Sequence, residues 1–172
     1  MARNVEIKAC VPDLAAVRQT ASALASAPAE RMTQTDTFFV VPTGRLKVRE
    51  FSDGSGELIA YERANESGPR ESVYTVARCQ NARALSEALG HVLPVRGVVT
   101  KHREVLIIGR TRVHLDEVEH LGAFLELEVV LRDDEPVQTG EREARDLMAA
   151  LGIPGAALVP DAYIDLLERT TV

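Results

Sequence analysis

The chain has 172 residues, of which 45% are hydrophobic and only 4% aromatic, so it can bury a core of aliphatic side chains and is not disordered. A formal net charge of −6 argues against non-specific nucleic-acid binding, and the two cysteines and four histidines show no zinc-type spacing. The first residues are charged and no apolar run could cross a membrane, so we expect one soluble, cytoplasmic domain over residues 1–172 that binds neither nucleic acid nor membranes.

Short segments of alternating polar and apolar residues, which are typical of strands, occur along the whole chain. The expected strands are 5–11, 34–41, 45–51, 57–63, 72–77, 97–108, 111–118 and 123–131. Residues at helical spacing predict four helices: one begins at Asp13, one is capped by Asn81, one begins at Gly140, and a last short one is capped by Asp161. Short turns favour antiparallel pairing, with a longer polar loop between 57–63 and 72–77, and about eight strands can close a small barrel.

The charged residues of these strands sort by face, because side chains two apart on a strand point the same way. Three strands carry charges of one sign at this spacing: Arg45, Lys47 and Arg49; Lys101 and Arg103; Glu126 and Glu128. The ordinary interpretation of alternation is one solvent-exposed face. However, like charges about 7 Å apart repel by roughly 2–3 kcal/mol at an effective dielectric constant near 20, and solvated faces usually mix signs.

Rows of one sign are expected if the charged faces line the inside of the barrel and the apolar faces lie outside, under the helices. Such an interior cannot be a dry core, because unpaired buried charge is too costly. It predicts a wet tunnel that holds a polyanion through its cations and a divalent metal through its carboxylates. The predicted fold is therefore α+β: a closed antiparallel eight-stranded β-barrel with flanking short helices.

Four segments resemble the CYTH, or triphosphate tunnel, superfamily. Val5-Glu6-Ile7-Lys8 is similar to its ExExK signature, and residues 36–49 are similar to its second block. Residues 112–128 resemble the block of the class IV adenylate cyclase branch, and residues 163–167 resemble the usual C-terminal ending. The four blocks follow in order from residue 4 to residue 167.

The resemblance implies a triphosphate tunnel that depends on Mg²⁺ or Mn²⁺. The residues expected to hold phosphate oxygens are Lys8, Arg45, Lys47, Arg63, Lys101, Arg103 and Arg112, with Arg49 on the face of Lys47. The residues expected to hold metal are Glu6, Asp116, Glu126 and Glu128, with Glu62 as a further candidate. Asn4 stands where the signature has its first Glu, and an uncharged amide oxygen should bind metal more weakly.

The function implied first is conversion of ATP to cyclic AMP and pyrophosphate. A triphosphatase that hydrolyses thiamine triphosphate or tripolyphosphate is the alternative, and a non-catalytic module that binds polyphosphate or nucleotides is a second. Glu6 and Lys8 are the candidate catalytic residues: cationic neighbours could lower the pKa of Lys8 and make it a general base, or it could simply anchor phosphate. The resemblance also allows a homodimer.

Overall fold

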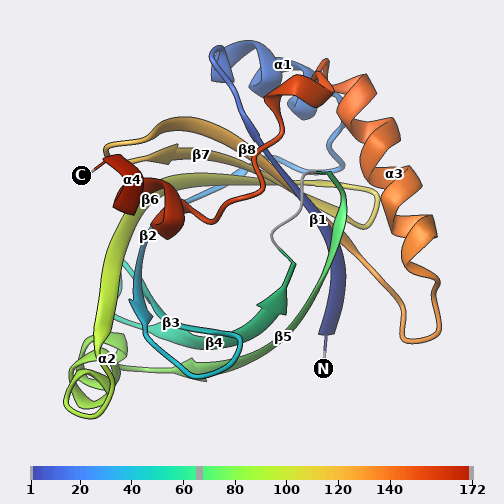
Figure 1. The fold of residues 1–172 in the computed structure, drawn as a ribbon. Coiled ribbons are helices and arrows are strands. Elements are labelled where there is room, and N and C mark those ends of the chain that lie inside the picture. The colour runs from blue at the N-terminus through green and yellow to red at the C-terminus, as the bar shows by residue number, and fades with distance from the viewer. Residues whose placement is uncertain (1, 65–67, 171–172) are drawn as a thin grey trace.

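The computed structural model describes residues 2–64 and 68–170. Its strands form a closed barrel in the order β1-β5-β4-β3-β2-β6-β7-β8, with every neighbouring pair antiparallel (Figure 1). The strands are β1 (Ala2–Cys10), β2 (Glu30–Phe39), β3 (Arg45–Phe51), β4 (Gly56–Arg63), β5 (Arg70–Cys79), β6 (Val95–Ile108), β7 (Thr111–Val118) and β8 (Gly122–Val130). The predicted eight-stranded antiparallel barrel is confirmed.

The strand bounds agree with the prediction best where the alternation is cleanest. β3 and β7 occupy the predicted residues, whereas β2 begins four residues earlier than predicted, at Glu30. The cause is pairing: residues 30–33 are paired with the 14-residue strand β6, although their own sequence is mostly polar. Part of the polar loop predicted between β4 and β5, residues 65–67, lies outside the described residues.

Four α-helices flank the barrel: α1 (Leu14–Leu24), α2 (Ala82–Gly90), α3 (Val137–Ala150) and α4 (Tyr163–Thr170). The side chain of Asn81 caps α2 as predicted, and that of Asp13 caps α1; each accepts a hydrogen bond from the backbone N–H group three residues on. α3 begins earlier than predicted, directly after Pro136. In the part of the chain that is described, no helix combines the length and the apolar character needed to span a membrane.

The start of α4 differs from the prediction that Asp161 caps it. Both carboxylate oxygens of Asp161 accept hydrogen bonds from the guanidinium of Arg169, at 2.8 Å each. The backbone N–H of Ala162 instead donates to Asp165 Oδ2, at 2.9 Å. An acidic side chain inside the first turn therefore satisfies a free N–H group at this helix end.

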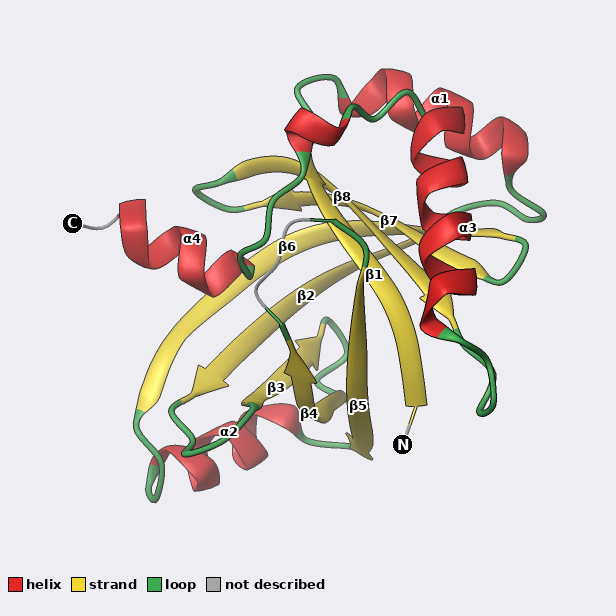
Figure 2. Ribbon diagram, turned by 45° about the vertical axis from the view of Figure 1, so that its right-hand side comes forward, coloured by secondary structure: helices red, strands yellow, loops and turns green. Residues whose placement is uncertain are grey.

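The hydrophobic core lies outside the barrel, between the strands and the helices. α1 and α3 cover the outward faces of β1, β7 and β8, where Ile7, Leu115 and Leu127 are almost fully buried (Figure 2). α3 approaches β1 closely at Gly140, where an added Cβ would come within 2.8 Å of Val5 Cγ2. Because alternate residues of these strands face the helices, the polar residues that stand between them face the barrel interior.

Candidate functional site

The barrel interior holds a cavity of about 530 Å³ that is lined mainly by charged side chains. Among the described residues, eight Lys and Arg side chains and six Asp and Glu side chains line it. The basic residues are Lys8, Lys47, Arg49, Arg63, Arg78, Lys101, Arg103 and Arg112. The acidic residues are Glu6, Glu30, Asp36, Glu57, Glu126 and Glu128. A cavity of this size and charge suits a small, highly charged ligand.

Asp36, on β2, lies at the centre of the largest group of cations. Its carboxylate accepts hydrogen bonds from Lys47 Nζ at 2.7 Å, from Lys101 Nζ at 3.0 Å, and from Arg49 at 2.8 and 2.9 Å. Burial alone would raise the pKa of Asp36, but Arg49, Lys101 and Lys47 hold it well below its usual range. One fixed carboxylate therefore orients three cations that line the cavity.

The lysines of this group would be stabilised in their charged form by a bound anion. Burial lowers the pKa of Lys101 to about 7, and nearby Arg49 and Arg103 add to the decrease, although Asp36 opposes it. The pKa of Lys47 is also lowered, mainly by burial and then by Arg49. Both pKa values would rise if an anion entered the cavity, so this wall of the barrel favours binding of a polyanion.

Asp116, on β7, fixes another cation. Its two oxygens accept hydrogen bonds from Arg103 Nε and Nη2, each at 2.6 Å, and the hydroxyl of Tyr163 donates to it at 2.7 Å. Asp116 is completely buried, and it does not belong to the lining of the cavity. The geometry therefore assigns Asp116 to orienting Arg103, whose Nη2 also donates to Glu126 Oε2 at 2.6 Å, so one guanidinium nitrogen links Asp116 to Glu126.

Glu6 and Lys8, on β1, both face the cavity and are both paired. Glu6 Oε1 accepts a hydrogen bond from Arg63 Nη1 at 2.6 Å. Lys8 Nζ lies 3.2 Å from Glu126 Oε1 and 3.7 Å from the centre of the Tyr163 ring. Burial lowers the pKa of Lys8 from its usual value, and the charge of Glu126 opposes that decrease. A lysine in this setting can lose its proton more easily than one in water.

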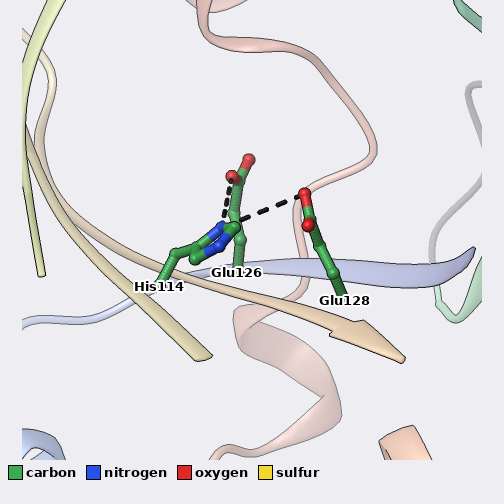
Figure 3. Close-up of side chains that lie close together, drawn as sticks. All are labelled: His114, Glu126 and Glu128. Carbon is green, nitrogen blue, oxygen red and sulfur yellow. Dashed lines mark ion pairs between the residues drawn. The ribbon is translucent and has the colours of Figure 1, made fainter. Parts of the chain in front are cut away.

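His114, Glu126 and Glu128 form a compact group of possible metal ligands on β7 and β8. One ligand atom from each lies within 4.8 Å of the others (Figure 3). His114 Nδ1 lies 3.8 Å from Glu126 Oε2 and 3.9 Å from Glu128 Oε1, and it has no hydrogen-bond partner among the described residues. Two carboxylates and one imidazole nitrogen fit a divalent cation.

Most of the site residues expected from the sequence meet in the cavity. Arg45 lies on the same face as Lys47, but is not in the lining and pairs with Asp165 of α4 at 3.4 Å. Glu62 is exposed, whereas its neighbours Tyr61 and Arg63 line the cavity, so Glu62 points away from it. Alternation explains this placement: a residue next to an inward-facing arginine must face outward.

Asn4 reaches the cavity, as its position in β1 predicts. It is 3% exposed and its side-chain oxygen has no hydrogen-bond partner in the described part of the chain. The Glu that the ExExK signature has at this position would place a further negative charge in this part of the cavity. The uncharged oxygen is therefore available to a ligand, but attracts a metal less strongly than a carboxylate would.

Sequence reasoning did not assign roles to Asp36 or Tyr163. Alternation could have placed Asp36 on one face of β2 with Gln34 and Phe38, which also line the cavity. Its position opposite Arg49 in the β2–β3 register is known only from the structure. Tyr163 gives no such signal. It reaches Asp116 and Lys8 only because α4 packs against the barrel, far from both in sequence.

The fold and this site define a barrel that holds charged groups in its interior. The family model for the CYTH domain matches residues 2–163. The chain therefore belongs to the CYTH domain family. No curated protein matches the sequence.

Several solved structures share the fold at low sequence identity. The protein PH1012 from Pyrococcus horikoshii OT3 is 23% identical, with a TM-score of 0.85 over 95% of this chain and 98% of that chain. A proposed adenylate cyclase from Vibrio parahaemolyticus is 18% identical, with a TM-score of 0.75 over 96% and 97%. The proposed adenylyl cyclase HpAC1 from Hippeastrum, described as having a dominant triphosphatase activity, is 14% identical, with a TM-score of 0.65 over 99% and 96%. These likenesses show the fold.

Proposed function

We propose that the protein is a divalent-metal-dependent enzyme that acts on a triphosphate inside the barrel. The first candidate reaction is conversion of ATP to cyclic AMP and pyrophosphate. Hydrolysis of thiamine triphosphate or tripolyphosphate is the alternative. The observation that carries the proposal is the pairing of two groups in one cavity: the cations fixed by Asp36 and Asp116, and the His114, Glu126 and Glu128 group.

In this proposal the cations bind the phosphate chain. Lys47, Arg49 and Lys101 would hold phosphate oxygens on one side, and Arg103 would hold them beside the carboxylates. A bound divalent metal, held by His114, Glu126 and Glu128, would polarise a phosphoryl oxygen and offset charge on the leaving group. Phosphoryl transfer needs mainly positioning and charge stabilisation, which this arrangement supplies.

The two reactions differ in the attacking group. In a cyclase the ribose 3′-oxygen forms a bond to the α-phosphorus, the bond to pyrophosphate breaks, and the 3′-hydroxyl proton leaves to a base. In a triphosphatase water attacks the terminal phosphorus and orthophosphate is released. Lys8 is the candidate base, because burial lowers its pKa. An apolar wall formed by Ile59 and Val76 in the same cavity supports a nucleotide, since a base needs such a surface.

The test is to incubate the purified protein with ATP, thiamine triphosphate and tripolyphosphate separately, with Mg²⁺ or Mn²⁺, and to separate the products by chromatography. Cyclic AMP with an equal amount of pyrophosphate establishes the cyclase. Orthophosphate from the other substrates, without cyclic AMP, establishes the triphosphatase. Glu126→Gln should lose either activity, whereas the exposed Glu62→Gln variant should keep it.

A third outcome supports the binding module instead. Tight binding of tripolyphosphate by calorimetry, with no product from any substrate, would overturn the enzymatic proposal. The Asn4→Glu variant then shows whether the missing carboxylate is the cause. If this variant gains turnover, the cavity has catalytic geometry that the uncharged Asn4 limits. If it does not, the cavity serves for binding.

A further inference from the structure

We propose that His114 is a direct metal ligand, and that its nitrogen makes the cavity prefer Mn²⁺ to Mg²⁺. This inference rests on the proposed function, because the ion would serve the same cavity. His114 lies on β7 directly opposite Glu126 of β8, and Glu128 shares the inward face of β8 with Glu126. The barrel register therefore brings one imidazole and two carboxylates together (Figure 3), and all three side chains line the cavity.

The first support is the state of His114 Nδ1. The residue is 5% exposed, and Nδ1 has no hydrogen-bond partner among the described residues. Buried polar atoms nearly always have a partner, because an unsatisfied one costs free energy. The separations of 3.8 and 3.9 Å from the two carboxylates are too long for hydrogen bonds. They are short enough for ligands of one ion, since each ligand atom lies about 2.1 Å from such an ion.

The second support is the chemistry of the donor set. Mg²⁺ prefers oxygen ligands and keeps several of its waters. Imidazole nitrogen suits first-row transition-metal ions better than it suits Mg²⁺. An oxygen-only site of Glu126 and Glu128 would have little reason to favour Mn²⁺. Adding His114 supplies the nitrogen that distinguishes the two ions.

The carboxylates of this group are partly occupied by cations in the ligand-free protein. Glu126 Oε2 accepts a hydrogen bond from Arg103 at 2.6 Å, and Glu128 Oε2 accepts one from Arg112 at 2.8 Å. Lys8 also pairs with Glu126 Oε1, at 3.2 Å. Phosphate oxygens that take over these arginines and Lys8 would release the carboxylates. Tripolyphosphate should therefore strengthen Mn²⁺ binding, and Mn²⁺ should strengthen tripolyphosphate binding by the same factor.

Pulsed electron paramagnetic resonance of bound Mn²⁺ tests the inference without using activity. In the presence of tripolyphosphate, the wild-type protein should show coupling of Mn²⁺ to ¹⁴N. Protein made with ¹⁵N-labelled histidine should show the ¹⁵N pattern instead, which identifies an imidazole and needs no substitution. The His114→Asn variant, which offers an amide oxygen, should lose the coupling, whereas a variant of the exposed His102, His102→Asn, should keep it.

Competition calorimetry gives the second readout. The ratio of Mn²⁺ affinity to Mg²⁺ affinity should fall about tenfold or more in His114→Asn and stay unchanged in His102→Asn. Bound Mn²⁺ without nitrogen coupling in the wild-type protein would overturn this inference and leave the proposed function in place. No Mn²⁺ binding, with or without tripolyphosphate, would overturn both the inference and the metal dependence of the proposed function.

Discussion

Lys101 Nζ lies 3.0 Å from Asp36 Oδ2, and both side chains are almost completely buried. Lys47 and Arg49 bind the same carboxylate, so three cations share one anion. The pKa of Lys101 falls to about 7 as a result of burial, with further lowering by neighbouring cations. The ion pair between Lys101 and Asp36 therefore depends on a lysine that can lose its proton near neutral pH.

Affinity for tripolyphosphate should decrease as the pH rises above about 7. Below that pH Lys101 is charged in the free protein, and above it the lysine must take up a proton when the anion binds. Calorimetry at pH 8, in two buffers of different ionisation enthalpy, should show proton uptake by the wild-type protein. Lys101→Arg should show less uptake, because arginine stays charged. Equal uptake by both proteins would contradict this assignment.

The same pKa shift predicts how the stability of the ligand-free protein changes with pH. The folded-state pKa of Lys101, about 7, lies below its usual value of 10.5. Between these pH values the unfolded chain binds more protons, so this residue makes the folded state more stable as the pH rises. Urea unfolding between these pH values measures the free energy of unfolding of the wild type and of Lys101→Met. This free energy should increase less with pH in the variant.

Replacing Asp36 by Asn should destabilise the ligand-free protein by about 3 kcal/mol, because three buried cations lose their counter-ion. Tripolyphosphate should restore part of this loss, since its oxygens can replace the carboxylate. Thermal unfolding with and without tripolyphosphate measures both effects. The control is Asp13→Asn, at an exposed cap where Asn serves as well as Asp. A ligand-induced stabilisation no larger in Asp36→Asn than in the wild type would speak against this role.

Asp116→Asn should weaken tripolyphosphate binding by roughly tenfold, because Arg103 loses a charged partner that holds it in place. The Mn²⁺ signal should keep its nitrogen coupling, since Asp116 lies outside the cavity lining. Tyr163→Phe, which removes only the hydroxyl donor to Asp116, should have a smaller effect of the same kind. Loss of Mn²⁺ binding in Asp116→Asn, with tripolyphosphate binding intact, would instead indicate a metal ligand.

Glu62 and Glu128 provide a matched comparison of two strand glutamates. Glu128 lines the cavity beside His114, and Glu62 is exposed on the outside of β4. Glu128→Gln should lower turnover of whichever triphosphate proves to be the substrate by about a hundredfold. Glu62→Gln should leave turnover within about twofold, because most surface substitutions are nearly neutral. Steady-state kinetics at saturating metal measures both turnover numbers. Equal losses in the two variants would contradict the prediction.

Alternation along the strands was enough to predict which charges face inward for most of the site. Lys47, Arg49, Lys101 and Arg103 lie at a spacing of two on their strands, and all of them line the cavity. The same rule explains why Glu62 points away from the cavity. Glu62 directly precedes an inward-facing Arg63, so the two cannot share a face. The expectation for Glu62 came from the resemblance, and not from the spacing.

The pairing between strands was not predictable from spacing. Arg103 reaches Asp116 because β6 and β7 are in a register that sets these two residues opposite each other. His114 and Glu126 meet in the same way between β7 and β8. Such contacts depend on the register across a sheet, which one strand's sequence does not state.

By itself, the sequence determined an eight-stranded barrel with its charges inside, because hydrophobic periodicity is a local property of each strand. Only the tertiary structure decided which charges neutralise each other and which remain for a ligand. Asp36 and Asp116 became fixed partners of cations, while His114 Nδ1 lies beside two carboxylates and has no hydrogen-bond partner in the described part of the chain. The physical reason is that Coulomb and hydrogen-bond energies depend on distances of a few ångströms between groups far apart in the chain.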